Sequence, residues 1–518
     1  MKKLIIFTFI AFLAVVFVHD DACISKPKYG KTLVFGSEED IVELDTHRGG
    51  SRFSKRFKCF YANGIVEMGR NYEIVPSLAQ SWELSKDGLQ FTFHVRKGVK
   101  LHNGRELTAE DIKFNLDRIR DPKNALLGRA YLQDVTAVNV TDRYTVKVNL
   151  QKPCGAFLEM LSNPNCFILA PECVNKDGKV TTLIGTGPFQ FIEWKPKLHI
   201  KVKKFKDYWE KGIPYVDEIT IKILTDPVAR LNAVLAGDVD ITHNLPMSQT
   251  IEYKKKPPKN LNILMEPTAG ANLIVFNILK PPFNDVRVRK AVAYGINKKE
   301  LLQAMYQGYG EVINQIFLKG SKWYFDVPDY TQDKEKAKAL LKEVHPGGLD
   351  CRMVVAAPSA IGIVAAQVIQ EQLKEIGFRI VIEIHDMATL YAKMNAGDFE
   401  FMSEDFGPMQ DPIMVYPYFY TRNSPYKRMV GGGEGYDNPK VKELFDKAGM
   451  TSNYEERKKL YTEALRIVLY DDVVNIYLVQ SPLMNACAIR SYVKDFQAHP
   501  EGWFVYPKGG FAHTWLDK

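Results

Sequence analysis

The sequence lacks the motifs that usually mark an enzyme or a metal site. Its seven cysteines form no C-x-x-C pair, which leaves a zinc site or a thioredoxin-type site without support. No histidine is followed by glutamate, so the H-E-x-x-H motif is absent, and there is no G-x-S-x-G nucleophile elbow. The ten histidines show no metal-ligand spacing. We therefore expect no metal, no cofactor and no catalytic residue, although a triad assembled from distant residues would escape this search.

The chain also lacks a strong excess of either charge. Lys and Arg number 69 and Asp and Glu number 61, which gives a net charge of +8 over 518 residues. Proteins that bind nucleic acid concentrate basic residues in a stripe. The lysine run at 254–256 is instead ended at once by two prolines, which favours a solvated loop. We expect no nucleic-acid partner, and the length allows roughly two to four domains.

No segment reaches the ~20 apolar residues of a membrane-spanning helix. The longest apolar run, 4–18, follows Lys2 and Lys3 and ends at Asp20-Asp21, which is typical of a secretory signal peptide. We predict a signal peptide over 1–22 and an extracytoplasmic, periplasmic location. A lipid anchor at Cys23 is the less favoured alternative, because the two aspartates occupy positions where lipoprotein signals carry small or apolar residues. An exported protein reaches an oxidising compartment, where cysteines 154, 166 and 173 could supply one local disulfide. The alternative is that they are buried free thiols.

Alternating and helical patterns indicate a mixed α/β protein. Residues 89–96 alternate between apolar and polar side chains, and Asp87-Gly88 predicts a hairpin turn to a partner strand at 82–84. Thr108 is expected to cap a helix that ends at 121–122. Residues 350–385 predict a strand, a helix closed by Gly377 and a second strand parallel to the first.

Several runs of the sequence resemble one family. They are PSLAQSWE at 76–83, LTAED at 107–111, GTGPF at 185–189, DYW at 207–209, LAGDVDI at 235–241, DVRVRK at 285–290 and DP at 411–412. In this order they resemble the extracytoplasmic solute-binding proteins of ABC transporters, in the family (bacterial solute-binding protein family 5) that holds dipeptide-, oligopeptide- and nickel-binding proteins. The resemblance covers about 31–518.

This resemblance implies an α/β fold of two lobes joined by a hinge, with an extra subdomain in the first lobe. Lobe I would comprise 31–65, the extra subdomain 66–185, and the segments 186–280 and 484–518, and lobe II would comprise 281–483. The implied function is capture of a small solute, most simply a di- or oligopeptide, between the lobes and delivery to the membrane permease subunits. The protein would be a monomer and would not be an enzyme.

In the peptide-binding members, an aspartate four residues before the proline of the motif matched at Asp411-Pro412 pairs with the α-amino group of the ligand. A buried ammonium needs such a carboxylate, because an unpaired buried charge is costly. The equivalent position here is Pro408. Asp405, or else Glu404, is the candidate to replace the missing carboxylate if the loop is longer here, and the favoured alternative is that both are solvated loop acids.

Further candidate ligand-binding residues follow from the same resemblance. Ser37 and Glu38 come directly after the first strand, at 32–35, where the cleft of the family begins. Asn277 is expected near the crossing between the lobes, either as a ligand contact or as a hinge residue, and Asp411 completes the set. Tyrosines 416, 418 and 420 would share one strand face if this stretch is extended.

Other functions remain open at this point. A metal chelate or an oligosaccharide could replace the peptide in the same transport role, and proline in place of an anchoring aspartate suits an uncharged ligand. A secreted hydrolase is the lower alternative, because no clustered nucleophile and base is visible.

Overall fold

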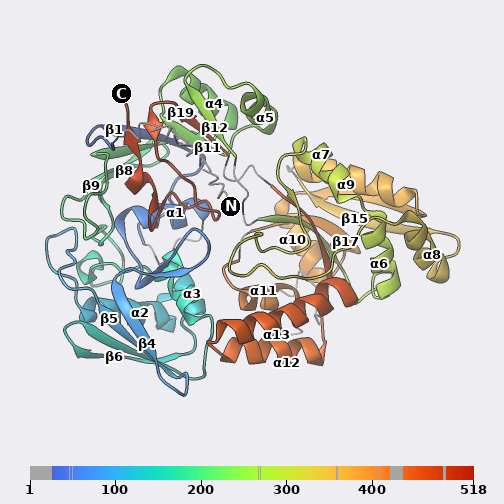
Figure 1. The fold of residues 1–518 in the computed structure, drawn as a ribbon, viewed down its shortest axis with the longest axis horizontal. Helices are drawn as coiled ribbons and strands as arrows, with labels where there is room; N and C mark the ends of the chain where they lie inside the picture. Colours follow the sequence, from blue (N-terminus) through green and yellow to red (C-terminus); the bar gives the residue numbers. More distant parts are fainter. Residues whose placement is uncertain are drawn as a thin grey trace, which may run out of the picture.

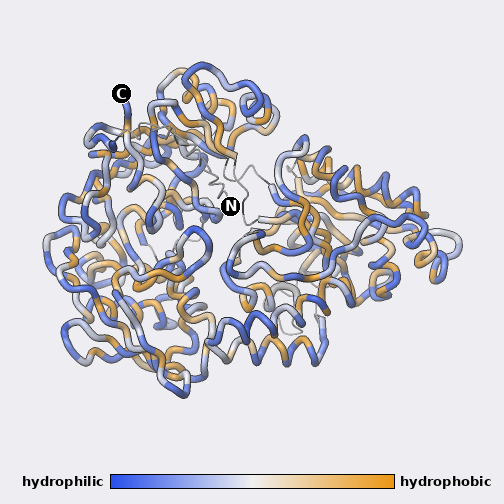
Figure 2. Tube along the Cα trace, viewed as in Figure 1, coloured by the Kyte–Doolittle hydropathy of each residue, from blue (hydrophilic) through white to orange (hydrophobic). Residues whose placement is uncertain are grey.

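The computed structural model describes residues 26–45, 47–48, 51–265, 268, 270–357, 360–407, 409–420, 436–481 and 486–518. The predicted signal peptide, Cys23 and Pro408 lie outside these residues. The described residues form two lobes, each with its own β-sheet (Figure 1). Apolar segments concentrate in the sheets and on the inner sides of the helices (Figure 2). In the described part of the chain, no helix combines the length and apolarity that a membrane crossing needs.

Lobe I is built on a seven-stranded sheet in the order β12-β19-β11-β1-β10-β9-β8. Strand β1 lies parallel to both of its neighbours, and the other pairs are antiparallel. The strands are β1 (Thr32–Ser37), β8 (Phe189–Lys195), β9 (His199–Lys204), β10 (Glu218–Ile223), β11 (Ile241–His243), β12 (Leu261–Leu264) and β19 (Cys487–Arg490). Helices α4 (Pro227–Ala236) and α5 (Met247–Lys255) belong to the same lobe.

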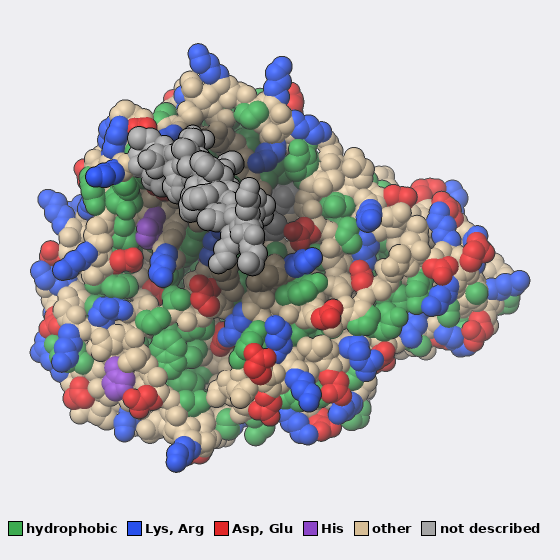
Figure 3. All heavy atoms as spheres, in the orientation of Figure 1, with side chains coloured by type: hydrophobic (Ala, Val, Ile, Leu, Met, Phe, Trp, Pro, Cys, Tyr) green, Lys and Arg blue, Asp and Glu red, His purple; other side chains and the backbone are tan. Residues whose placement is uncertain are grey.

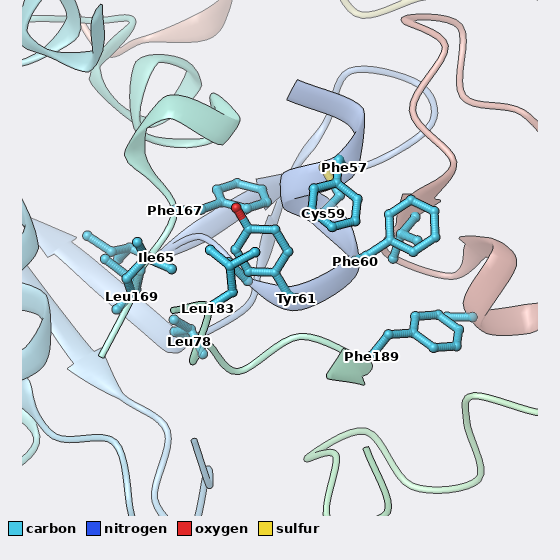
Figure 4. Packing of buried hydrophobic residues seen from close by; sticks show 14 of the residues in the cluster. Phe57, Cys59, Phe60, Tyr61, Ile65, Leu78, Phe167, Leu169, Leu183 and Phe189 are labelled. Atoms are coloured by element: carbon cyan, nitrogen blue, oxygen red, sulfur yellow. The ribbon is translucent and has the colours of Figure 1, made fainter. Parts of the chain in front are cut away.

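Helix α1 (Arg52–Tyr61) carries the aromatic core of lobe I. Phe53, Phe57 and Phe60 recur at helical spacing and are buried. Figure 4 shows Phe57, Phe60 and Tyr61 beside Phe167 and Phe189, which come from distant parts of the chain. This packing fixes α1 against the sheet and therefore fixes the polar side chains on its other face.

The extra subdomain contains a four-stranded antiparallel sheet in the order β4-β5-β7-β6. Its strands are β4 (Ala79–Leu84), β5 (Gln90–Val95), β6 (Val135–Asp142) and β7 (Thr145–Leu150), and helices α2 (Ala109–Arg120) and α3 (Phe157–Leu161) accompany them. The predicted hairpin is confirmed, as is the helix after Thr108, whose backbone N–H donates to Asp111 Oδ2 at 2.8 Å. A short hairpin, β2 (Val66–Met68) with β3 (Ile74–Pro76), precedes this sheet.

Lobe II is built on a six-stranded sheet in the order β14-β18-β13-β17-β15-β16. The strands are β13 (Ala271–Phe276), β14 (Glu311–Val312), β15 (Leu349–Ala356), β16 (Phe378–His385), β17 (Phe401–Phe406) and β18 (Asn475–Gln480). The predicted parallel pair at 350–385 is confirmed as β15 and β16, joined by α9 (Ala360–Lys374). The other helices are α6 (Val286–Gly295), α7 (Lys298–Tyr306), α8 (Lys334–Val344), α10 (Met387–Ala396), α11 (Pro412–Phe419), α12 (Pro439–Met450) and α13 (Tyr454–Arg466).

Two local expectations are decided by these elements. The condition stated for tyrosines 416, 418 and 420, an extended stretch, is not met, because α11 spans Pro412–Phe419. Asp411 caps this helix by accepting a hydrogen bond from the Ile413 N–H at 3.0 Å, and proline is well suited to a first helical position. Of the two cysteine alternatives, the structure has free thiols at residues 154, 166 and 173.

In the order of the described strands, the chain passes from lobe I to lobe II once and returns once. It enters lobe II between β12 and β13 and returns between β18 and β19. Strands β13 and β18 are neighbours in the lobe II sheet, so both crossings meet the same end of that sheet. This end, which includes Asn272, Asp405 and Gln480, is called the crossing end below.

Candidate functional site

The lobes contact each other in the region next to the crossings. Gln410 Nε2 of lobe II donates to Glu501 Oε2 of lobe I at 2.6 Å. Lys255 Nζ at the end of α5 donates to Gln307 Oε1 after α7 at 3.2 Å. Polar side chains of the two lobes therefore face each other directly between the lobes.

A second interlobe contact involves the turn before α3. The Gly155 N–H donates to the Gly449 carbonyl at 2.7 Å, and Arg457 Nη1 donates to the Gly155 carbonyl at 2.7 Å. Lys322 Nζ lies 2.8 Å from Glu159 Oε1. A Cβ at Gly155 would lie 2.0 Å from the Thr451 carbonyl oxygen, so only glycine permits this approach. Figure 1 shows α3 beside α13, where the lobes meet.

Asp405 lies at the crossing end of the lobe II sheet. It sits on β17 opposite Asn272 of β13, and Asn272 Nδ2 donates to Asp405 Oδ1 at 3.1 Å. The side chain is accessible to solvent, yet surrounding atoms crowd it, so desolvation raises the pKa of Asp405 although the Asn272 hydrogen bond lowers it. Within the described chain, no cationic side chain pairs with this carboxylate. Asp405 is thus a carboxylate that still lacks a countercharge.

Glu404 belongs to the other face of the same strand. It pairs in register with Leu273, and adjacent residues of a strand point to opposite faces. The two acids therefore do not converge on one group of a ligand. The structure brings Asp405 rather than Glu404 together with Asn272.

Buried amide groups at the crossing end have hydrogen-bonding capacity to spare. Asn272 Oδ1 and both side-chain polar atoms of Gln480 are buried and have no hydrogen-bond partner among the described residues. Leaving such a group unsatisfied costs about 1–3 kcal/mol. These residues were not predicted from the sequence, because isolated Asn and Gln residues form no motif. Their position beside the two crossings is the signal that could have found them.

The lobe I side of this region contributes Lys55 and Glu501. Burial raises the pKa of Glu501 to about 7, although Gln410 and Lys55 both lower it, and its Oε1 is buried without a hydrogen-bond partner among the described residues. Burial lowers the pKa of Lys55, which is half-buried on α1. Sequence reasoning missed both, since nothing local distinguishes them from surface charges.

Ser37 and Glu38 are predicted site residues that already have internal partners. Ser37 is buried at the end of β1, and its Oγ donates to the Glu39 carbonyl at 2.8 Å. Arg56 Nη1 lies 3.1 Å from Glu38 Oε1, and His243 contacts the other carboxylate oxygen. Burial alone would raise the pKa of Glu38, but His243 and Arg56 hold it well below its usual range. The charge of Glu38 is therefore compensated within lobe I.

Asn277 and Asp411 are likewise engaged by protein groups. The expectation that Asn277 lies near the crossing is wrong, because it follows β13 at the far end and six strand residues span about 20 Å. Its Nδ2 donates to the Gly397 and Phe399 carbonyls at 3.2 and 2.9 Å. Asp411 is fully buried and accepts hydrogen bonds from Arg457 Nη2 at 2.9 and 2.7 Å.

The described residues contain no group of three or more His, Cys, Asp or Glu that could hold a metal ion. Acidic and basic side chains are interspersed over the face shown in Figure 3.

The described structure has two lobes joined by two crossings, and polar groups between the lobes lack a hydrogen-bond partner or a countercharge among the described residues. This is the arrangement of a two-lobed solute-binding protein. The chain belongs to family 5 of the bacterial extracellular solute-binding proteins, because the family model "Bacterial extracellular solute-binding proteins, family 5 Middle" matches residues 73–428. The protein is thus the substrate-binding component of an ABC importer, in a family of extracytoplasmic binding proteins rather than enzymes.

Known proteins similar to this chain cover nearly all of it. The glutathione-binding protein GsiB of Salmonella choleraesuis is 26% identical over 501 residues, which are 93% of each chain. The binding protein AgaA of A. tumefacien, solved in complex with agropinic acid, is 29% identical with a TM-score of 0.74 and covers 94% of this chain and 99% of its own. HbpA2 of Haemophilus parasuis is 26% identical with a TM-score of 0.82, covering 94% and 100%.

Proposed function

We propose that this protein captures a short peptide with a free amino terminus between its lobes and delivers it to the permease subunits of an ABC importer. The observation that carries the proposal is Asp405, an accessible carboxylate without a countercharge at the crossing end of lobe II. A peptide ammonium supplies that countercharge. The similarity to a glutathione-binding protein supports a peptide-like ligand.

The residues around Asp405 suit the rest of such a ligand. Asn272 positions the carboxylate, and its Oδ1, which has no hydrogen-bond partner among the described residues, can accept a hydrogen bond from a peptide amide. Lys55 on the lobe I side suits an anionic group of the ligand, because it forms no salt bridge within the described chain, although Glu501 lies near enough to raise its pKa. Contacts from both lobes to one ligand favour the closed arrangement.

The remaining predicted site residues have supporting roles in this proposal. Glu38 holds Arg56 and His243 in place behind the site, and Ser37 shapes the turn after β1. Asn277 and Asp411 secure the loops around β17 and α11. We further propose that the protein acts as an exported monomer without catalytic activity, with residues 1–22 as its signal peptide.

Native mass spectrometry of the purified protein, followed by calorimetry, tests the ligand class. We expect a retained peptide mass, and binding of defined di- to tetrapeptides or glutathione. The matched control is each peptide with an acetylated amino terminus, which lacks the ammonium and should bind at least about thirtyfold more weakly. Equal binding of acetylated peptides would contradict the ammonium anchor. A retained sugar or metal chelate, with no peptide binding, would contradict the peptide itself.

A further inference from the structure

Lobe I contains a cavity of about 350 Å³ that is lined entirely by its own residues. Its walls come from the β2–β3 hairpin, the segment 208–213 and the C-terminal segment 505–513. Three glutamates (67, 73 and 210) share it with the aromatic rings of Tyr208, Trp209 and Tyr506. Nothing in the proposed capture of a peptide uses these groups.

Glu67 is the most deeply placed of the three glutamates, with 7% of its surface exposed. Its Oε1 accepts hydrogen bonds from Asn63 Nδ2 at 2.8 Å, the Gly64 N–H at 3.3 Å and Ser77 Oγ at 2.6 Å. In the described chain Oε2 receives no hydrogen bond, and no cationic side chain pairs with the carboxylate. Burial and the nearby negative charge of Glu210 raise the pKa of Glu67, although its three hydrogen bonds lower it.

The other two carboxylates are held at the same cavity. Glu73 Oε2 accepts a hydrogen bond from the Asn71 N–H at 2.9 Å, and its side chain folds over Gly69, where a Cβ would lie 2.2 Å from Oε1. Among the described residues, the basic group in contact with Glu210 is His513, whose Nε2 lies 4.0 Å from Oε1. Lys508 also lines the cavity but forms no ion pair within the described chain. The three carboxylates therefore leave the cavity short of positive charge.

We propose that this cavity binds a linear aliphatic polyamine. Its ammonium groups would pair with Glu67, Glu73 and Glu210, and its methylene chain would lie against the aromatic rings, which also attract cations. A divalent metal is a poorer fit, because it needs several oxygen ligands at about 2.0–2.6 Å. The described residues contain no cluster of three or more His, Cys, Asp or Glu side chains close enough together to hold a metal ion. The volume lies within the usual range of small-molecule pockets, about 300–1,000 Å³.

Calorimetry of the wild-type protein with spermidine and putrescine, and with hexane-1,6-diol as the uncharged control, tests the proposal. We expect one site for the amines and none for the diol. Glu67→Gln should weaken spermidine binding at least about tenfold, because a charge-assisted hydrogen bond is lost. Gly69→Ala displaces the Glu73 side chain and should also weaken spermidine binding. It therefore tests the site even if Glu67→Gln fails to fold. Glu252→Gln, a change on the exposed face of α5, is the matched control and should have no effect.

Spermidine binding that survives both Glu67→Gln and Gly69→Ala would overturn the assignment, as would absence of amine binding to the wild type. Displacement of spermidine by millimolar calcium at constant ionic strength would overturn the polyamine class in favour of a metal. Asp405→Asn separates this site from the peptide site. Loss of spermidine binding in that variant would place the amine between the lobes and overturn the cavity site, whereas unchanged binding supports it.

Discussion

At the scale of single residues, the region between the lobes contains two kinds of carboxylate. Glu38 is compensated by Arg56 and is largely buried, whereas the partner of Asp405 among the described residues is the Asn272 amide. This difference could not be predicted from the sequence, because the partners of Glu38 come from α1 and β11. The replacement of the missing aspartate at Pro408 by Asp405 was predicted from position alone and still requires a binding measurement.

Asp405→Asn should weaken binding of a free-amino peptide by about 2–5 kcal/mol, or thirtyfold and more. The amide keeps the shape of the side chain and an oxygen acceptor for Asn272, so the melting temperature without ligand should change little. Calorimetry with a defined peptide library measures the effect. Glu404→Gln is the matched control on the opposite face of β17 and should leave the affinity within about threefold. Equal losses in both variants would contradict the assignment.

Glu501 gives a prediction for pH. An unfolded glutamate ionises near pH 4.5, whereas Glu501 in the folded protein keeps its proton until about pH 7. The folded state therefore holds more protons in this window, so the contribution of Glu501 to stability falls as pH rises from about 4.5 to 7. Glu501→Gln removes this pH-dependent contribution to stability and keeps an acceptor for Gln410. The variant should gain about 1–3 kcal/mol relative to the wild type between pH 4.5 and pH 8.

Chemical denaturation across that pH range measures the difference in stability between the two proteins. Glu252→Gln again serves as the control, because it makes the same chemical change at an exposed position. Parallel pH profiles for wild type and Glu501→Gln would show that Glu501 ionises normally.

At the scale of elements, local sequence signals were sufficient to predict helices and strands where the hydrophobic pattern was regular. The β15–α9–β16 unit and the β4–β5 hairpin were predicted because alternation, turn residues and caps agree. The helix at 412–419 was not predicted, because the spacing of tyrosines says nothing about backbone conformation, while Asp411-Pro412 is itself a helix start. Contacts between distant elements, such as α3 with α13, carry no local signal at all.

The α3 contact leads to a prediction about closure. Gly155→Ala places a Cβ against the Thr451 carbonyl and should disfavour the approach of the lobes. A shift of about 1–2 kcal/mol toward the open state would weaken peptide binding roughly fivefold to thirtyfold without touching the ligand. Calorimetry and X-ray scattering of the unliganded variant measure this, and the radius of gyration should rise. A loss of stability with unchanged affinity would mean that the contact persists when the lobes open.

At the scale of the whole molecule, ligand binding should couple to closure and to stability. A ligand at a hundredfold excess over Kd should stabilise the folded state by about 2.7 kcal/mol. The radius of gyration from X-ray scattering should fall when the peptide is added. Asp405→Asn at the same peptide concentration is the control, and its stabilisation should fall to about 0.9 kcal/mol or less, with a correspondingly smaller change in radius. An unchanged radius with saturating ligand would argue against movement of the lobes.

The place of β19 in the lobe I sheet has a consequence for biosynthesis. This strand lies between β12 and β11, so residues 487–490 must arrive before those two strands are joined into one sheet. The lobe II sheet, in contrast, is complete once residue 480 has been made. During synthesis the lobe I sheet therefore remains unfinished until residues 487–490 have been made, after the lobe II strands.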